Sequence, residues 1–383
     1  MIVQTLDLQN FRNIESAHLE FSPGFNVIYG ANAQGKSNLL EALYVLAFLK
    51  GFRADKIANL IRFAQPNAAL SAYVADGNTG FRLGVALQGK SRRLFVNNTL
   101  CAKMNEYLGL LRAILFIPAH VSILQSAPEI RRNLLDRMVF TLHPSYLIDL
   151  VHYQKITKQK SSILKSECPD KRLLDVYDEQ MTATGERLIR ARYDYLRRLQ
   201  PFLWRAFSEI FGENRRCTLK YVSATKPRGI ACDSASSVDT ADAIVESFRM
   251  HVAKSRALEL QKMQICSGPH RDDWTIDLDG QPARHFASQG QQRALSIAMK
   301  IAEILCLKSE TQVEPILLLD DISSEFDPTR HRNLFRYLNR LTGQIFLTTT
   351  SKSLVHIDDI GKLFKIDQGI IENDAISTDD DCR

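Results

Sequence analysis

Residues 25–49 read FNVIYGANAQGKSNLLEALYVLAFL and hold the pattern that decides the fold. Five residues of strand character run directly into GANAQGKS, residues 30–37, which fits G-x-x-x-x-G-K-[ST]. Apolar residues at helical spacing follow from Asn38 onward. A buried strand, a glycine-rich turn and a helix in this order are the setting in which such a loop binds phosphate. The alternative is an ordinary glycine turn that matches by chance.

The residue types in this loop suit a nucleoside triphosphate. Glycines let the backbone curl so that its N–H groups point at phosphate oxygens, and the start of the helix adds positive potential. The Lys36 ammonium is expected to reach the β- and γ-phosphates, and the Ser37 hydroxyl to bind Mg²⁺. We therefore predict ATP and Mg²⁺ as cofactors. The predicted nucleotide contacts in this loop are Gly30, Ala31, Asn32, Ala33, Gln34, Gly35, Lys36, Ser37 and Asn38.

A second motif, PILLLDD at residues 315–321, predicts the partner of this loop. Four consecutive apolar residues indicate a central parallel strand that is buried on both faces. Acidic residues at its carboxyl end would lie beside the phosphate loop, where open α/β sheets bind ligands. We assign Asp320 to Mg²⁺, through water, and Asp321 to polarising the attacking water as catalytic base. A solvated acidic turn is the alternative.

Residues 286–306, FASQGQQRALSIAMKIAEILC, predict a largely buried helix with small polar residues at its start. Such a start can bind an anion, and we expect Ser288, Gly290 and Gln291 to contact nucleotide. The alternative is a serine N-cap on a core helix. The order of phosphate loop, S-x-G-Q, hydrophobic strand with two acids and Ser324–Asp327 resembles that of ABC-type ATPase heads. In such heads this helix start faces the γ-phosphate of a second subunit, and Ser324–Asp327 resembles the D-loop.

Further blocks narrow the resemblance to the bacterial RecF family. They are LDLQNFRNIE, GANAQGKSNLLEALY, SAPEIRRNLLDRM, YDEQMTATGERLIRARYDYL, SGPHRDDW, ASQGQQRALSIAMKIAE, LLLDDISSEFD and GQIFLTTT, in family order over most of the chain. The resemblance implies an SMC-like ATPase without the long coiled coil, and an ATP-dependent homodimer that binds DNA at single-strand gaps. It also implies RecO and RecR as partners, help in loading the RecA recombinase, and a weak DNA-stimulated ATPase. His120, where the family has an acid, and the block 222–242 depart from its pattern.

The fold class predicted is α/β, an ABC-type head with a mainly helical insertion. We expect head residues 1–110 with the phosphate loop, a helical second lobe at 111–265, and head residues 266–383 with the S-x-G-Q helix and the acidic strand. Residues 222–242 are expected to form a loop or an edge hairpin. Threonines 348–350 lie where many ABC proteins carry a switch histidine.

Composition limits the function classes. The chain has 383 residues, 45% hydrophobic and 24% charged, as expected for a soluble globular protein. Seven scattered cysteines without a CxxC pair argue against a disulfide framework or zinc site and favour a reducing cytoplasm. No apolar run approaches the roughly 18 residues of a membrane span, and the N-terminal residues do not resemble a signal peptide. The net charge of +6 permits a nucleic-acid partner without requiring one.

DNA binding would depend on lysine and arginine contacts to phosphate. The candidates chosen are Arg131, Arg132, Arg187, Arg190, Arg197 and Arg198, with Arg92, Arg93, Lys155, Lys158 and Lys160 also considered. Each cluster has the alternative of a solvated surface. The block 268–273, GPHRDD, could hold a metal pair or catalytic dyad, but a braced turn is favoured. Functional alternatives are an ATPase subunit of a transporter, an ATPase of a nuclease-coupled defence complex, and a small-molecule kinase.

Overall fold

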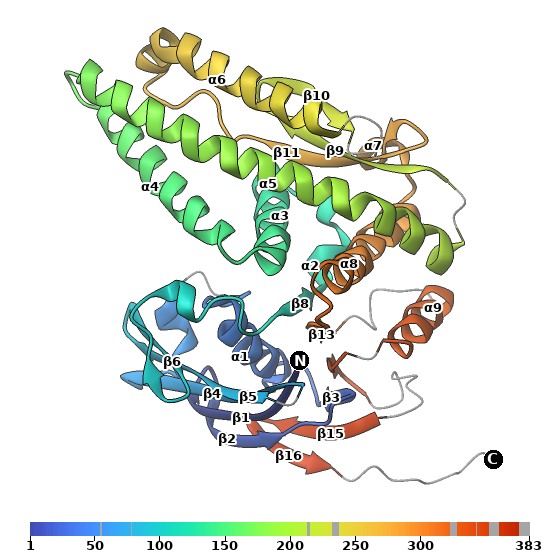
Figure 1. Ribbon diagram of the computed structural model, residues 1–383. Helices are drawn as coiled ribbons and strands as arrows, with labels where there is room; N and C mark the ends of the chain where they lie inside the picture. The colour runs from blue at the N-terminus through green and yellow to red at the C-terminus, as the bar shows by residue number, and fades with distance from the viewer. Residues whose placement is uncertain are drawn as a thin grey trace. The chain divides into compact units, whose positions relative to one another are not determined.

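The computed structural model describes residues 1–53, 56–77, 79–212, 215–231, 237–321, 328–341, 343–351 and 360–374. The chain forms two compact units (Figure 1). The first comprises Met1–Val121 with Leu307–Arg383, and the second is Ser122–Cys306. No helix in the described ranges has both the length and the apolar character needed to cross a membrane.

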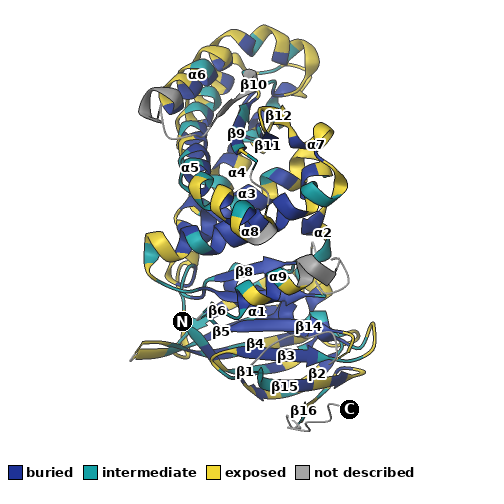
Figure 2. Ribbon diagram, turned by 90° about the vertical axis from the view of Figure 1, so that its right-hand side faces the viewer, coloured by how far each residue is buried: buried dark blue, intermediate teal, exposed yellow. Residues whose placement is uncertain are grey.

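The first unit contains a six-stranded sheet that carries the phosphate loop. Its strand order is β16-β15-β3-β14-β13-β8, and every pairing is parallel except that of the edge strand β16. The strands are β3 (Phe25–Tyr29), β8 (Ala113–Phe116), β13 (Ile316–Asp320), β14 (Ile345–Thr349), β15 (Ile360–Asp367) and β16 (Ile370–Asp374). The strands β3, β8, β13 and β14 consist almost wholly of buried residues, as Figure 2 shows for β3, β8 and β14. Burial on both faces explains their continuous apolar sequences.

A second, antiparallel sheet in the first unit has the order β2-β1-β4-β5-β6-β7. Its strands are β1 (Ile2–Phe11), β2 (Ile14–Glu20), β4 (Asn67–Asp76), β5 (Thr79–Gln88), β6 (Ser91–Val96) and β7 (Thr99–Leu100). Buried and less buried residues alternate along β4 and β5, because only one face of this sheet covers the core. The helix α1 (Lys36–Phe48) contacts strands of both sheets and therefore lies between them. Its burial on all sides fits its continuous apolar sequence.

The second unit combines long helices with a small antiparallel sheet of order β10-β9-β11-β12 (Figure 1). Its helices are α3 (Pro128–Leu142), α4 (Tyr146–Leu164), α5 (Lys171–Phe211), α6 (Ser237–Lys262), α7 (Ala283–Phe286) and α8 (Gln289–Thr311), the last ending in the first unit. Its strands are β9 (Cys217–Ser223), β10 (Lys226–Ala231), β11 (Asp273–Leu278) and β12 (Gln281–Pro282). The helix α5 packs against both α4 and α6. The other helical elements within the described ranges are η1 (Ile57–Leu60), η2 (Met104–Glu106), α2 (Pro118–Val121), η3 (Ile123–Gln125) and α9 (Pro328–Leu338).

The bounds of the two units differ from the predicted division into 1–110, 111–265 and 266–383. The strand β8, inside the predicted insertion, pairs in parallel with β13 of the first unit. A four-residue apolar run cannot be told from buried helix by periodicity, so only its pairing reveals it. Most of α8 groups with the second unit, where Glu303 and Cys306 lie close to Tyr195 of α5. Of the block 222–242, β10 is an edge strand paired with β9, so the expected edge hairpin is present.

Candidate ATP-binding site

The phosphate loop connects the end of β3 to the start of α1, and two of its glycines are required by close contacts. Gly30 has φ +156° and Gly35 has φ +115°, conformations that favour glycine. A Cβ atom at Gly30 would lie 2.3 Å from the carbonyl oxygen of Ile366, and one at Gly35 would lie 2.8 Å from the Asn13 side-chain amide. The loop is therefore packed tightly against β15 and the β1–β2 turn.

The Lys36 side chain lies along the loop and its ammonium donates to two loop carbonyl oxygens. These are Gly30 O at 2.7 Å and Ala31 O at 2.8 Å. Burial lowers the pKa of Lys36; the carboxylates of Asp321 and Asp320 oppose this shift, and Arg53 adds to it. The ammonium therefore lies in the negative field of both acids, within the loop that is predicted to hold phosphate.

The buried carboxylate of Asp320 is the centre of the polar contacts at this site. Its Oδ1 atom accepts hydrogen bonds from the hydroxyls of Ser37 at 2.6 Å and Thr348 at 2.9 Å, and its Oδ2 atom accepts one from Arg53 at 2.9 Å. The next residue, Asp321, has φ +48°, and its backbone N–H donates to the Thr348 hydroxyl at 3.0 Å.

These residues line one cavity of about 400 Å³ in the first unit. Its walls are formed by Asn32, Ala33, Gly35, Lys36, Ser37, Asn38, Arg53, Pro118, Asp320 and Asp321. The structure thus brings the predicted loop residues and both acids together from segments some 280 residues apart. Gly30, Ala31 and Gln34 contribute to the site through backbone carbonyl oxygens. Those of Gly30 and Ala31 accept hydrogen bonds from Lys36, and Gln34 O accepts one from Asn13 Nδ2 at 2.9 Å.

The donor set fits Mg²⁺. Mg²⁺ prefers hard oxygen ligands, keeps several waters and needs only one or two protein ligands when phosphates supply others. A serine hydroxyl and a buried carboxylate 2.6 Å apart meet this requirement. Among the described residues no group of three or more His, Cys, Asp or Glu side chains forms a larger metal cluster.

Sequence reasoning missed Arg53 and Asn13. Arg53 follows α1, forms the ion pair with Asp320, and its guanidinium lies 5.7 Å from the Phe52 ring centroid. Asn13 supports the loop and also accepts a hydrogen bond from Asn38 at 2.8 Å. Asn13 lies in the block LDLQNFRNIE that carries the family resemblance, and Arg53 lies in a short polar stretch after an apolar helix. Thr348, noted only as standing in place of a histidine, contacts both acids of the motif.

The S-x-G-Q motif lies in the second unit, at the start of α8. Ser288 is exposed, and Gly290 and Gln291 are partly buried. The side chains of Ser288 and Gln291 both form hydrogen bonds at this helix start. The predicted D-loop, Ser324–Asp327, lies outside the described residues.

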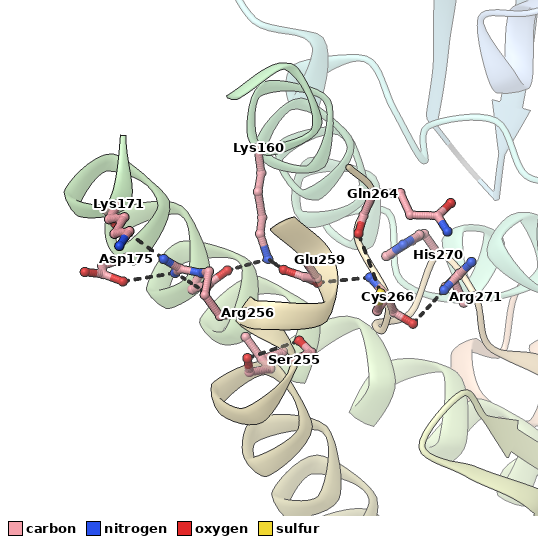
Figure 3. Close-up of polar contacts among 12 residues, drawn as sticks. Lys160, Lys171, Asp175, Ser255, Arg256, Glu259, Gln264, Cys266, His270 and Arg271 are labelled. Carbon is pink, nitrogen blue, oxygen red and sulfur yellow. Dashed lines mark hydrogen bonds and ion pairs between the residues drawn. The ribbon is translucent and has the colours of Figure 1, made fainter. Parts of the chain in front are cut away.

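The predicted DNA contacts include residues that the structure places in the interior. Arg131 is 3% exposed and forms an ion pair with Asp273, so its expected role at the surface is wrong. Lys160, also considered, is fully buried with Nζ 2.5 Å from Asp178 Oδ1 and 2.6 Å from Glu259 Oε2, as Figure 3 shows for Glu259. A helical spacing alone does not tell a buried cation from an exposed one, because the acidic partners come from other helices and strands.

The other predicted arginines are less buried. Arg187 and Arg190 are exposed on α5 and pair with Asp149 and Asp242. Arg197 and Arg198 are partly buried on the same helix. Arg132 is partly buried and donates to the carbonyl oxygen of Asp272 at 2.9 Å. These five remain predictions as DNA contacts.

The block 268–273 forms a braced turn between α6 and β11. Its backbone and acids accept hydrogen bonds from Arg192, which donates to Pro269 O at 2.6 Å, and from Tyr221, which donates to Asp272 Oδ2 at 2.5 Å. The His270 ring lies 2.8 Å from the Tyr153 hydroxyl. Every one of these contacts is made within the second unit, which agrees with the structural interpretation of this block.

Comparison with known proteins assigns the family. The model described as the RecF/RecN/SMC N terminal domain matches residues 2–372. A DNA replication and repair protein RecF of Streptococcus suis (strain 05ZYH33) is 35% identical over 373 residues, covering 96% of this chain and 98% of that protein. One of Citrifermentans bemidjiense is 36% identical over 371 residues, with 96% and 98% covered. The chain belongs to the RecF family.

Solved structures agree with this RecF assignment. The recombination mediator protein RecF-ATP in the RecFOR pathway matches with a TM-score of 0.85 and 31% identity, covering 97% of both chains. The structure described as RecF-ATPrS matches with a TM-score of 0.87, 31% identity and 98% of both chains covered. An SMC head bound to the C-winged helix domain of ScpA matches with a TM-score of 0.55 and 14% identity, which shows that the fold is shared. The predicted ABC-type, SMC-like head fold and the predicted family are therefore confirmed.

Proposed function

We propose that this RecF-family chain is an ATP-dependent DNA-binding protein of recombinational repair and replication restart. Two copies bind each other when each holds Mg²⁺ and ATP, and the pair binds DNA at single-strand gaps. ATP hydrolysis opens the pair, so the turnover is slow and acts as a switch. The convergence of Lys36, Ser37, Asp320 and Asp321 on one cavity supports this proposal most strongly.

In this proposal the triphosphate occupies the 400 Å³ cavity. Lys36 leaves its two loop carbonyl oxygens and donates to the phosphates, which compete well because they are charged acceptors. Ser37 and Asp320 hold Mg²⁺, which neutralises phosphate charge. A bound Mg²⁺ would supply positive charge beside Asp320, the role that the Arg53 guanidinium has at Oδ2 in this structure. Asp321 accepts the proton of the attacking water.

A second cavity of about 720 Å³ supports the placement of the nucleoside. It is lined by Arg12, Asn13, Asn38, Ala58, Asn59, Ile61, Arg62, Phe63, Ala64, Gln65, Pro66 and Gly89. Asn38 lines both cavities, so phosphates in the smaller one would direct the base and sugar into the larger. Phe63, whose side chain is 96% exposed, offers a ring on which a base can stack.

The first turn of α8 is proposed to bind the γ-phosphate on the second copy. The Ser288 hydroxyl and the Gly290 N–H are donors at a helix start, where the dipole also favours an anion. ATP can drive pairing only through its greater affinity for the paired state. A preference of about 100-fold would supply about 2.7 kcal/mol.

The DNA contact is proposed for α5, with the exposed Arg187 and Arg190 and the partly buried Arg197 and Arg198, supported from α3 by Arg132. Binding by such side chains follows phosphate positions rather than base sequence. The RecFOR pathway named for the solved relatives supports RecO and RecR as protein partners. We propose loading of RecA as the outcome, as the family resemblance implies.

The test is the molar mass in solution, measured by light scattering without nucleotide, with ADP and with ATP plus Mg²⁺. We expect a dimer only with ATP, and a monomer with ATP when Ser288→Arg blocks the start of α8. Nucleotide binding to Ser288→Arg, measured by calorimetry, should be retained because the phosphate loop is intact. The proposed pairing would be refuted by a molar mass that does not change with ATP, or by a Ser288→Arg variant that dimerises as wild type does.

A further inference from the structure

The helix α9 of the first unit has an apolar side and a basic side. The apolar side is buried and consists of Leu334, Phe335 and Leu338. The basic side is exposed and carries three arginines at intervals of four residues, Arg332, Arg336 and Arg340. The last of them lies in the turn that continues α9, where its backbone N–H donates to Tyr337 O at 3.0 Å. Because residues four apart lie on one face of a helix, these arginines form a single row toward solvent, here called the α9 arginine row.

No acidic side chain of the described ranges neutralises the α9 arginine row. The sequence between Asp327 and Asp358 contains no aspartate or glutamate. None of the three guanidiniums forms an ion pair with a described residue. The exposed arginines of α5 differ in this respect, since Arg187 pairs with Asp149 and Arg190 with Asp242. A phosphate would have to compete with these carboxylates on α5, but it would meet no such competition on α9.

The stability of α9 itself does not account for the row. A cation in the last turn of a helix is favourable, but one is sufficient, and Arg332 lies before that turn. Like charges four residues apart repel each other and destabilise a helix. The apolar stems of the arginines could cover apolar surface, yet the apolar side chains of α9 lie on its other side. The repulsion is therefore compensated only when an anion approaches this face.

The shape of the row suits a linear polyanion with regularly spaced charges. Residues four apart are separated by about 6 Å along a helix axis, and the phosphates of one DNA strand recur about every 3.4 Å along the duplex. Each arginine can therefore reach a different phosphate of a duplex. Single-stranded DNA is usually held by stacking on exposed aromatic rings. The aromatic residues of α9, Phe335 and Tyr337, are buried and partly buried, so the row favours the duplex form.

We propose that the α9 arginine row binds the phosphate backbone of duplex DNA. The inference rests on the proposed DNA-binding function, and it adds a contact in the first unit to those proposed on α5 in the second. Contacts to phosphate carry no base information, so the affinity should not depend on the base sequence of the duplex.

The test is the binding of a fluorescein-labelled DNA duplex to the full chain, with Mg²⁺ and a non-hydrolysable ATP analogue, measured by anisotropy at several salt concentrations. Replacing all three arginines of the row with glutamine should reduce the magnitude of the slope of log K against log salt by about 2.7, at about 0.9 for each lost phosphate contact. Arg332→Gln alone should reduce it by about 0.9. Replacing all three with lysine should keep the slope of wild type, because the positive charges remain.

The matched control replaces Arg205, Arg215 and Arg249 with glutamine. Each of these has an exposed or partly exposed side chain and is already paired with an acid. The change in net charge is the same as in the row variant, but the slope should remain that of wild type. Calorimetric titration with ATP should give the wild-type affinity for every variant, because the phosphate loop and the apolar side of α9 are unchanged.

The inference is overturned if the glutamine variant of the row keeps the slope of wild type, a result that would make an acidic protein surface the better partner. It is also overturned if the control lowers the slope equally, since net charge alone would then explain the effect, or if the lysine variant loses as much as the glutamine variant. A failure of the proposed function gives a different result. Wild type would then bind no duplex at any salt concentration, whereas the inference alone fails if wild type binds and only charge reversal on α5 lowers the slope.

Discussion

The hydroxyl of Ser37 lies 2.6 Å from a carboxylate oxygen of Asp320, although 283 positions separate the two residues. The contact joins the start of α1 to the end of β13, because β3 and β13 both end at the same edge of the parallel sheet. The other oxygen of the carboxylate pairs with Arg53. Two hydroxyls, from Ser37 and Thr348, and the Arg53 guanidinium thus satisfy the carboxylate that is proposed to hold the metal.

Asp321→Asn is expected to separate binding from turnover. An amide cannot accept the proton of the attacking water, so the rate of ATP hydrolysis should fall about 100- to 10,000-fold. The phosphate contacts of Lys36 and Ser37 remain, so ATP affinity should change little, and the ATP-bound dimer should persist. Phosphate release and calorimetry measure the two quantities. Normal turnover in this variant would remove Asp321 from the role of base.

Lys36→Ala should weaken ATP binding by about 10- to 150-fold, because it removes hydrogen bonds from a charged donor to the phosphates. Lys90→Ala is the matched control, since Lys90 is an exposed lysine on the turn between β5 and β6. Calorimetric titration with ATP and Mg²⁺ compares the two variants. Equal affinities would show that the cavity beside Lys36 does not take the triphosphate.

Lys160→Met should lower the free energy of unfolding by about 3–5 kcal/mol, because it leaves the Asp178 and Glu259 carboxylates without their buried counter-ion. Lys158→Met changes an exposed lysine on the same helix and should cost less than about 0.5 kcal/mol. Urea unfolding followed by circular dichroism gives both values. Similar losses in the two variants would mean that the ion cluster around Lys160 does not stabilise α4, α5 and α6.

Charge reversal at Arg187, Arg190, Arg197 and Arg198 should weaken DNA binding and flatten its dependence on salt. The slope of log K against log salt should decrease in magnitude by about 0.9 for each lost phosphate contact. Arg215→Glu is a control, because Arg215 is also paired with an acid, Asp279. Fluorescence anisotropy at several salt concentrations measures the slopes. An unaltered slope would show that these residues of α5 do not contact DNA phosphates.

His270 should make the protein less stable as the pH falls. Burial and the nearby charges of Arg271 and Arg132 lower its pKa from 6.5 to about 4. Between these two pH values the unfolded chain binds a proton at His270 that the folded chain does not bind. The contribution of His270 to the free energy of unfolding is therefore complete above pH 6.5 and is lost as the pH falls toward 4. The loss from pH 7 to pH 4.5 should amount to roughly 2 kcal/mol.

His270→Asn removes this titration. The loss of unfolding free energy between pH 7 and pH 4.5 should therefore be smaller in this variant than in wild type, by the roughly 2 kcal/mol assigned to His270. His251→Asn, at an exposed position on α6, is the control and should follow wild type. Denaturant unfolding at pH 7 and pH 4.5 measures the difference. If the unfolding free energy of His270→Asn still fell with pH as it does in wild type, the titrating group would be another residue.

The sequence by itself determined the local elements and the family. Two patterns are local: the strand, glycine loop and helix at residues 25–49, and the apolar strand before Asp320. They can be read from the sequence because neighbouring residues decide the backbone conformation and the spacing of apolar residues. Those two motifs also predicted that Lys36, Ser37, Asp320 and Asp321 share a site, since parallel strands end at a common edge. The resemblance in ordered blocks predicted the RecF family.

Only the tertiary structure decided which groups meet outside those two motifs. The pairing of β8 with β13, the contact of Arg53 with Asp320 and the burial of Arg131 and Lys160 depend on partners far along the chain. A cation on an amphipathic helix has the same sequence pattern whether an acid from another helix or solvent faces it. The capping box that Ser288 and Gln291 form at the start of α8 is an intermediate case: the spacing permits it, and the folded turn selects it, because the N–H groups of the first helical turn need acceptors.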